Sequence, residues 1–172
     1  RMMAGPVDYT QGAMHNASRE NFRAIHDEPM SQGTRCRQLA EYIVFDSPLN
    51  MLCDSPSSYE REHECTSFIA GIPTVWDHTT VLCGKVSEYI ATARQKGNIW
   101  YVGAMTNWEE CTIEIDLSFL GAGDFKAEIF RDGVNAYRYA RDYKKELIEI
   151  PADRKLKVRM APGGGFAARI YQ

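Results

Sequence analysis

The sequence predicts an α/β segment followed by an all-β domain. Residues 1–72 carry apolar side chains at helical spacing, interrupted by short apolar runs typical of strands. Residues 73–172 lose the helical spacing and alternate apolar and polar positions instead. We therefore expect the last two β-α units of a (β/α)8 barrel in residues 1–72 and a C-terminal antiparallel β-sandwich domain in residues 73–172.

The first segment reads as strand, long loop, helix, strand and helix, which makes two consecutive β-α units. The first helix is the clearest, because Cys36, Leu39 and Ile43 fall on one face and Pro48 ends the pattern. Asp54-Ser55-Pro56 marks a turn or a helix start. The expected strands are residues 2–7 and 49–53, and the expected helices are residues 34–45 and 62–70.

The second segment contains eight short candidate strands. In CTIEIDLSFL, for example, Ile113 and Ile115 face one way, while Glu114 and Asp116 face the other. Turn signals such as Lys96-Gly97-Asn98 separate the runs at intervals of roughly 8–12 residues, which is typical of a sandwich. The expected strands are residues 79–86, 88–95, 99–106, 112–117, 125–131, 146–150, 155–160 and 166–170.

The chain starts in the middle of an apolar run, MMAGPV, with Asp8, Tyr9 and Thr10 after it. Two β-α units cannot close a barrel, which needs eight such units and about 250 residues. Two units also leave exposed strand edges on both sides. We interpret the chain as the last quarter of a barrel and its following domain, separated from strands that lie upstream.

The composition excludes several classes of partner. The protein has 172 residues, of which 44% are apolar and 25% charged, and its formal net charge is −3. This charge gives no basic footprint for nucleic acid, and no stretch has the roughly 20 apolar residues of a membrane span. The five cysteines, Cys36, Cys53, Cys65, Cys83 and Cys111, are odd in number and contain no Cys-x-x-Cys pair, so a complete disulfide framework is excluded.

Barrel enzymes place their working residues at the C-terminal ends of the strands. Asp8, Tyr9 and Asp54 follow the two predicted strands, where carboxylates and a phenol suit hydrogen bonding to a polyhydroxylated substrate. The alternative is that Asp8 and Asp54 only cap the turns that follow them. His15 and His26 lie in the long loop over the expected barrel mouth and are further candidates for substrate contact.

Other suggestive patterns have simpler interpretations. Glu60, Glu62 and Glu64 alternate, so they do not share a helical face as paired catalytic carboxylates would, and a solvated helix start explains them. The histidines lack ligand spacing. The glycines of APGGGFAARI lie between two strands and form a turn, and Asn16-Ala17-Ser18 matches an N-glycosylation acceptor only as a short pattern. The three tryptophans, Trp76, Trp100 and Trp108, form either a sugar-stacking platform or core packing.

Long stretches of the chain resemble the C-terminal part of glycoside hydrolase family 97. They are MAGPVDYTQGAM, SQGTRCRQLAEYIVFDSPLNMLCDSPSSYERE, ECTSFIAGIPTVWD, EIFRDGVNA and MAPGGGFAARI. The resemblance implies a bacterial α-glucosidase or α-galactosidase with an N-terminal β-sandwich, a central (β/α)8 barrel and a C-terminal β-domain. The stretch GTRCRQLAEYIVFDSPLNMLCDSP resembles the retaining, α-galactosidase-like members more than the inverting ones.

By this resemblance the catalytic carboxylates, and the glutamates that bind a calcium ion, lie upstream of Arg1. We therefore assign no catalytic and no metal residue to this chain, and take Asp8, Tyr9 and Asp54 as the substrate-binding wall of the pocket. The resemblance also implies a periplasmic or secreted enzyme whose partners are an oligosaccharide substrate and the remainder of the parent protein. By itself the chain would be inactive.

The alternative function is a non-catalytic carbohydrate-binding module with an exposed aromatic row, for which Trp100 and Trp108 are the candidates. A third possibility is that the β-domain only supports the barrel.

Overall fold

The computed structural model describes residues 5, 6 and 8–172. The first part contains short strands and all the α-helices: β1 (Tyr9–Gln11), β2 (Asn16–Ala17), β3 (Ser31–Gln32), α1 (Arg35–Val44), β4 (Asn50–Leu52), α2 (Pro56–Arg61) and α3 (His63–Ala70). The second part contains eight strands and a 3₁₀ turn: β5 (His78–Lys85), β6 (Tyr89–Lys96), β7 (Ile99–Thr106), β8 (Cys111–Asp116), η1 (Ser118–Leu120), β9 (Lys126–Asp132), β10 (Tyr143–Glu149), β11 (Lys155–Met160) and β12 (Gly165–Tyr171).

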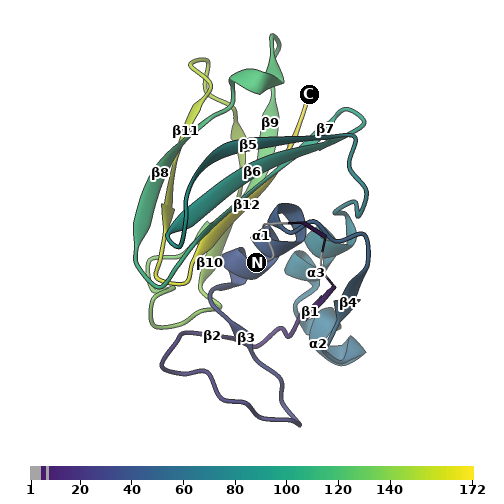
Figure 1. Ribbon diagram of the computed structural model, residues 1–172, viewed down its shortest axis with the longest axis vertical. Helices are drawn as coiled ribbons and strands as arrows, with labels where there is room; N and C mark the ends of the chain where they lie inside the picture. The colour runs from purple at the N-terminus through teal and green to yellow at the C-terminus, as the bar shows by residue number, and fades with distance from the viewer. Residues whose placement is uncertain (1–4, 7) are drawn as a thin grey trace.

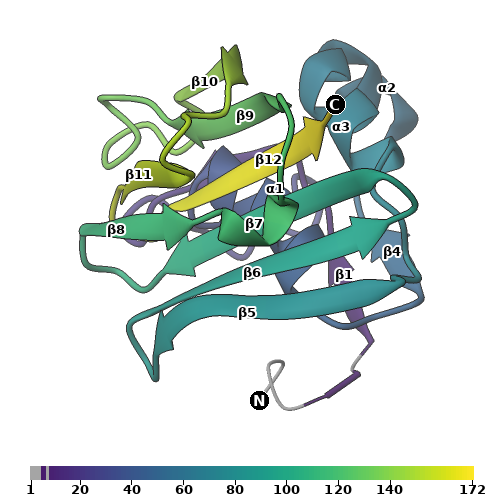
Figure 2. The same cartoon turned by 90° about the horizontal axis from the view of Figure 1, so that it is seen from above.

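The second part is built on a six-stranded antiparallel sheet in the order β10-β9-β12-β7-β6-β5. The antiparallel pair β8–β11 covers one face of this sheet, and α1 lies on the other (Figures 1 and 2). Side chains from both sheets form one core, which includes Ile115, Met160 and Phe166. All eight predicted strands are present, with bounds shifted by at most three residues, so the prediction of an antiparallel β-domain is confirmed.

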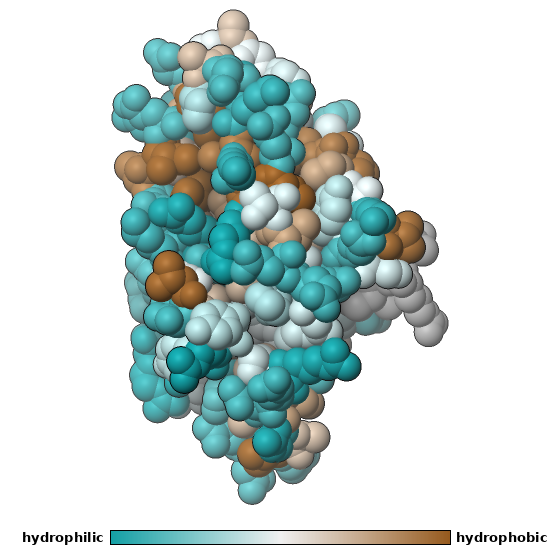
Figure 3. Space-filling model, turned by 90° about the vertical axis from the view of Figure 1, so that its left-hand side faces the viewer, coloured by the Kyte–Doolittle hydropathy of each residue, from teal (hydrophilic) through white to brown (hydrophobic). Residues whose placement is uncertain are grey.

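The β8–β11 pair is small compared with the sheet that it covers. As a result, several apolar side chains at the margin of the core are only partly buried, among them Phe119, Ile148 and Leu156. Figure 3, which views the side of β8 and β11, shows a mainly hydrophilic surface crossed in its upper half by a band of apolar side chains.

Helix α1 is enclosed on all sides. Every residue of the helix except Arg37 is buried, although only one face was expected to be. The helix approaches β7 and β12 closely because glycines face it: a Cβ on Gly103 would lie 3.0 Å from the Ala40 carbonyl oxygen, and one on Gly165 would lie 2.5 Å from the Arg37 Cα. This close contact attaches the first part of the chain to the β-domain.

Strands β1 and β4 pair in parallel, with Tyr9 opposite Asn50, and α1 lies between them in the sequence. The predicted second strand is therefore confirmed. The predicted first strand falls largely on residues 2–4 and 7, which lie outside the described residues. The observed strand is Tyr9–Gln11, so the expectation that Tyr9 and Thr10 follow a strand is wrong: they belong to one, because their backbone pairs with β4.

The predicted helix at 62–70 is confirmed as α3, which ends at Gly71. A separate short helix, α2, precedes it. Ser55 is its N-cap and accepts a hydrogen bond from the Ser58 amide, and Pro56 occupies the first turn, where its missing N–H costs nothing. The helix-start interpretation of Asp54-Ser55-Pro56 is thus correct. None of the described helices has the length and apolarity needed to cross a membrane.

Candidate functional site

A polar pocket of about 510 Å³ lies where the loops that follow β1 and β4 meet. Both strands run in the same direction, so their C-terminal ends deliver these loops to one edge. Residues of α2 and of the β9–β10 loop complete the wall. The titratable side chains that line it include His15, His26, Asp54, Arg61, Glu62 and Arg141.

Both carboxylate oxygens of Asp54 accept hydrogen bonds from backbone amides at the edge of this pocket. Its Oδ2 accepts a hydrogen bond from the Met14 amide at 2.7 Å, and its Oδ1 accepts one from the Ser55 amide at 2.7 Å. Burial raises the pKa of this carboxyl, but those hydrogen bonds, the Ser58 hydroxyl and the Arg61 charge outweigh it, so the pKa lies below its usual value. Asp54 is therefore a fixed anion at neutral pH. It suits hydrogen-bond acceptance and does not suit proton donation.

The structure does not bring Tyr9 to this pocket. Its ring packs on α1, 5.3 Å from the Phe45 ring and 6.2 Å from the Tyr42 ring. Burial, followed by the nearby Glu41 carboxylate, raises the pKa of Tyr9. Asp8 is exposed beside β1 and does not line the pocket either. Of the three predicted substrate-binding residues, only Asp54 lies at this site, and its contact with substrate stays a prediction.

Both loop histidines lie in the pocket wall. The Nδ1 of His15 is 3.4 Å from the Glu28 carboxylate, and His26 lies nearby on the same loop. Both residues were predicted as candidates for substrate contact from their place in the loop that follows the first strand, and that contact stays a prediction.

A buried arginine that no sequence pattern marked holds this wall in place. Arg35 has no exposed surface, and its guanidinium donates to the Asn16 side chain at 2.5 Å, the Met14 carbonyl at 2.5 Å and the Glu62 carboxylate at 2.8 Å. It thereby connects the loop after β1 to the junction between α2 and α3. An arginine at the start of an amphipathic helix gives no sign of burial, so the sequence offered no signal for it.

The remaining sequence patterns have structural roles. Glu62 pairs with Arg35, and Glu64 accepts a hydrogen bond from the Tyr143 hydroxyl at 2.7 Å. Asn16 is buried, so it is unsuited to glycosylation in the folded chain. The glycine run is a turn, as predicted. Trp100 is buried against the Phe119 ring, whereas Trp108 is half-buried at the surface, so a three-tryptophan platform does not form.

Residues 5, 6 and 8–172 contain no group of three or more His, Cys, Asp or Glu side chains placed to hold one metal ion. All five cysteines are free thiols in this structure.

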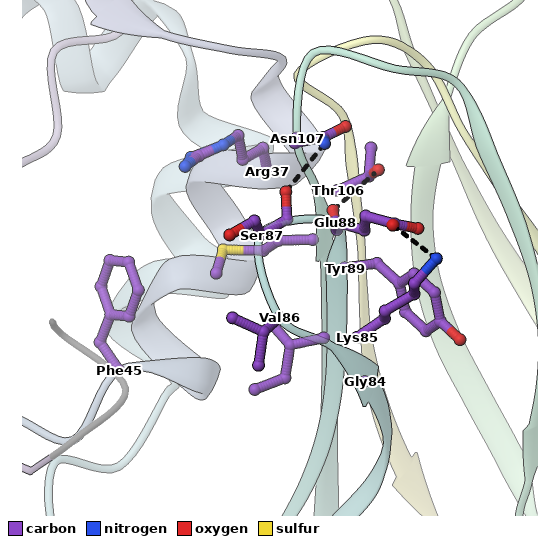
Figure 4. Close-up of a pocket in the computed structure, with 12 residues that line it drawn as sticks. Arg37, Phe45, Gly84, Lys85, Val86, Ser87, Glu88, Tyr89, Thr106 and Asn107 are labelled. Atoms are coloured by element: carbon purple, nitrogen blue, oxygen red, sulfur yellow. Dashed lines mark hydrogen bonds and ion pairs between the residues drawn. The ribbon is translucent and has the colours of Figure 1, made fainter.

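A second cavity, of about 610 Å³, lies between the β5–β6 hairpin and α1 (Figure 4). Its polar contacts belong to the hairpin turn: the Asn107 side chain donates to the Ser87 carbonyl, and Lys85 pairs with Glu88. Apolar side chains such as Phe45 and Val86 form much of the remaining wall. Its three charged side chains are already paired, Lys85 with Glu88 and Arg37 with Glu41. The pocket at the strand ends is lined by more charged and titratable groups and is therefore the better candidate site.

Comparisons with known proteins establish the family to which this chain belongs. The family model described as "Glycosyl-hydrolase 97 C-terminal, oligomerisation" matches residues 75–171. The chain belongs to glycoside hydrolase family 97, as its resemblance to that family predicted.

Particular relatives are similar over nearly the whole chain. A "Retaining alpha-galactosidase" of Bacteroides thetaiotaomicron is 62% identical over 170 residues, which are 99% of this chain and 26% of that protein. A "Probable retaining alpha-galactosidase" of Streptomyces bingchenggensis is 27% identical over 98% of this chain and 24% of its own length. The chain thus spans about a quarter of the length of the curated relatives it matches.

Solved structures of family 97 enzymes are also similar to this chain. A family 97 enzyme from Pseudoalteromonas sp. strain K8, in complex with panose, is 36% identical with a TM-score of 0.76 and covers 81% of this chain and 22% of that one. The same enzyme in complex with acarbose matches equally well. A β-arabinopyranosidase, 20% identical with a TM-score of 0.71 over 83% of this chain and 22% of its own, shares the fold.

Proposed function

We propose that this chain is the C-terminal portion of a retaining α-galactosidase that removes terminal α-galactosyl groups from oligosaccharides. The observation that carries the proposal is a polar pocket at the C-terminal ends of β1 and β4, in a chain 62% identical to a protein named for that activity. Barrel enzymes place their active sites at this end of the strands.

The β1–β4 pair supports the barrel assignment. Parallel strands normally have both faces covered, yet here α1 covers only one face. On the other side Thr10 and Met51, which are opposite each other in the register, are exposed. Two strands also leave two open edges. Further parallel strands beside this pair would cover the two open edges, and closure of the sheet into a barrel would cover the exposed face. Residues 1–72 would then complete a (β/α)8 barrel that carries residues 73–172 as its C-terminal β-domain.

Asp54, His15 and His26 would form one wall of the sugar pocket. An ionised carboxylate accepts hydrogen bonds from sugar hydroxyls, and the backbone amides of Met14 and Ser55 hold it in position for this. The nucleophilic carboxylate, the acid that protonates the leaving oxygen and the calcium-binding glutamates would come from a part of the enzyme outside this chain. Calcium would therefore bind there, and the enzyme would act in the periplasm or outside the cell.

The test uses the complete natural protein that contains this chain. We expect it to hydrolyse an aryl α-galactoside in preference to an aryl α-glucoside, and NMR to detect the α-anomer of the released sugar first, since a retaining enzyme keeps the configuration. Preference for the glucoside, or first appearance of the β-anomer, would contradict the proposal. Residues 1–172 alone should hydrolyse neither substrate, and turnover by them would contradict the placement of the catalytic carboxylates.

A further inference from the structure

Two more cavities adjoin the pocket at the strand ends, and lining residues that they share join the three into one groove. A cavity of about 220 Å³ shares His15 and Arg141 with the pocket. Another cavity, of about 740 Å³, shares Ser18, Asn21 and Arg138 with the 220 Å³ cavity. The groove therefore leads from the ends of β1 and β4 to the surface of the β-domain.

Two loops from distant parts of the sequence form the walls of this groove. Residues 15–21, around β2, form one wall, and residues 137–141 of the β9–β10 loop form the other. In Figure 1 the β9–β10 loop, drawn in green, lies beside β2 in the lower part of the molecule. At the far end, Trp108 and Pro162 come from the loops after β7 and β11.

The β9–β10 loop presents aromatic rings to the groove on a fixed backbone. Ala136 and Ala140 are buried, and the Arg35 amide donates to the Ala140 carbonyl at 2.8 Å. Between these anchors, Tyr137 is 50% exposed and Tyr139 is 53% exposed. Large aromatic side chains held outward on an anchored loop are typical of binding surfaces, because little conformational entropy is lost when a ligand covers them.

Trp108 is held in place by a glycine. A Cβ on Gly163 would lie 2.3 Å from an atom of the Trp108 ring, so the ring lies against bare backbone there. Gly163 also has φ +65°, which disfavours any other residue. Trp108 and Tyr137 thus line the same end of the groove, and the side chains of Asn21, Glu20 and Arg138 line it with them.

We propose that this groove binds the part of an oligosaccharide that extends beyond the terminal sugar, with Tyr137 and Trp108 as a stacking platform on the β-domain. Aromatic rings suit the apolar faces of sugar rings, while amide, carboxylate and guanidinium groups suit their hydroxyls. The proposal rests on the proposed function, because it takes the pocket at the strand ends as the place of the terminal galactosyl group.

The test measures the ratio of kcat/KM for the α-galactosyl tetrasaccharide stachyose to kcat/KM for p-nitrophenyl α-galactoside, in the complete natural protein. Loss of one stacking ring lowers binding by a factor of about 3 to 10, so Tyr137→Ala and Trp108→Ala should each lower this ratio by that factor. Tyr137→Phe keeps the ring and should keep the ratio. Leu147→Ala removes a side chain that is 65% exposed on β10 and lines none of the three cavities, so it should leave both rates unchanged.

A second measurement does not depend on turnover. Stachyose in excess, but not galactose, should protect Trp108 from brief oxidation by N-bromosuccinimide on ice, as read by peptide mass spectrometry. An unchanged ratio together with no protection overturns the groove, while cleavage of the aryl galactoside still supports the proposed function. Protection of Trp108 in a protein that cleaves neither substrate supports oligosaccharide binding in the groove and refutes the proposed α-galactosidase activity.

Discussion

Replacing Arg35 by methionine tests whether the pocket wall depends on a buried charge. The guanidinium has no exposed surface and donates to Asn16, to the Met14 carbonyl and to Glu62. Methionine has similar length but no donor. Arg35→Met would therefore leave the Glu62 carboxylate without its partner and two buried oxygens, on Met14 and Asn16, without these hydrogen bonds.

The expected cost follows from that geometry. Removing one member of a buried ion pair typically costs about 3–5 kcal/mol, because the other charge stays behind uncompensated. The Glu62 side chain is 29% exposed and regains some hydration, which places the expected loss near the lower end, at about 3 kcal/mol. With a urea dependence of about 2 kcal/mol per molar, the unfolding midpoint should fall by about 1.5 M.

The assay is urea unfolding of the 172-residue chain, followed by circular dichroism, with Arg159→Met as a matched control. Arg159 pairs with Glu110 at the surface, where both side chains are about half exposed, so its loss should cost less than about 1 kcal/mol. If Arg35→Met were as mild as Arg159→Met, the reasoning that Arg35 holds the wall would be refuted.

Three further predictions concern the β-domain and the pocket. Burial raises the pKa of Asp132 to about 6, although the Thr34 hydroxyl and the backbone amides of Ala161 and Gly165 oppose it. The folded state then holds this proton more tightly than the unfolded one, so the stabilisation is fully present below about pH 4 and is lost as the pH rises through 6. Burial also raises the pKa of Glu41 to about 7, which adds to the same loss. Urea midpoints between pH 4 and 7 should therefore decline, and Asp132→Asn should make this decline smaller. Gly165→Ala would place a Cβ 2.5 Å from the Arg37 Cα and should destabilise the chain by about 3 kcal/mol in the same urea assay. The control is Gly97→Ala at an open turn, which should cost less than about 1.5 kcal/mol although the φ of Gly97 is +56°. Asp54→Asn in the complete protein should lower kcat/KM for an aryl α-galactoside about 10-fold, because a charged hydrogen bond becomes a neutral one; an unchanged value would leave Asp54 with only its structural role.

Local sequence patterns were sufficient to predict the strands of the β-domain. Alternation such as Ile113 and Ile115 against Glu114 and Asp116 fixes which face of a strand is buried, and it does so within a few residues of chain. The helix at 34–45 was equally clear from its spacing. The order of the strands was not accessible, because β12 pairs with β7 and β9 across long stretches of sequence.

The candidate site was only partly accessible. Asp54, His15 and His26 could be placed at one edge because loops after parallel strands meet there. Tyr9 was misplaced, since its strand begins where a loop was expected and the alternation of that strand directs its ring to α1. No pattern in the sequence marks Tyr137 as a neighbour of the loop that contains Asn21.

The sequence by itself determined the eight strands of the β-domain, the helices at 34–45 and 62–70, and the family, because these depend on spacing, turn residues and long matching motifs. Only the tertiary structure decided that Arg35 is buried and that residues 15–21 and 137–141 face each other across one groove. Burial and long-range proximity are properties of packing: α1 is enclosed by the sheet on one side and by the β1–β4 pair on the other, so its polar face is buried as well. Such contacts leave no trace in the periodicity of any one segment.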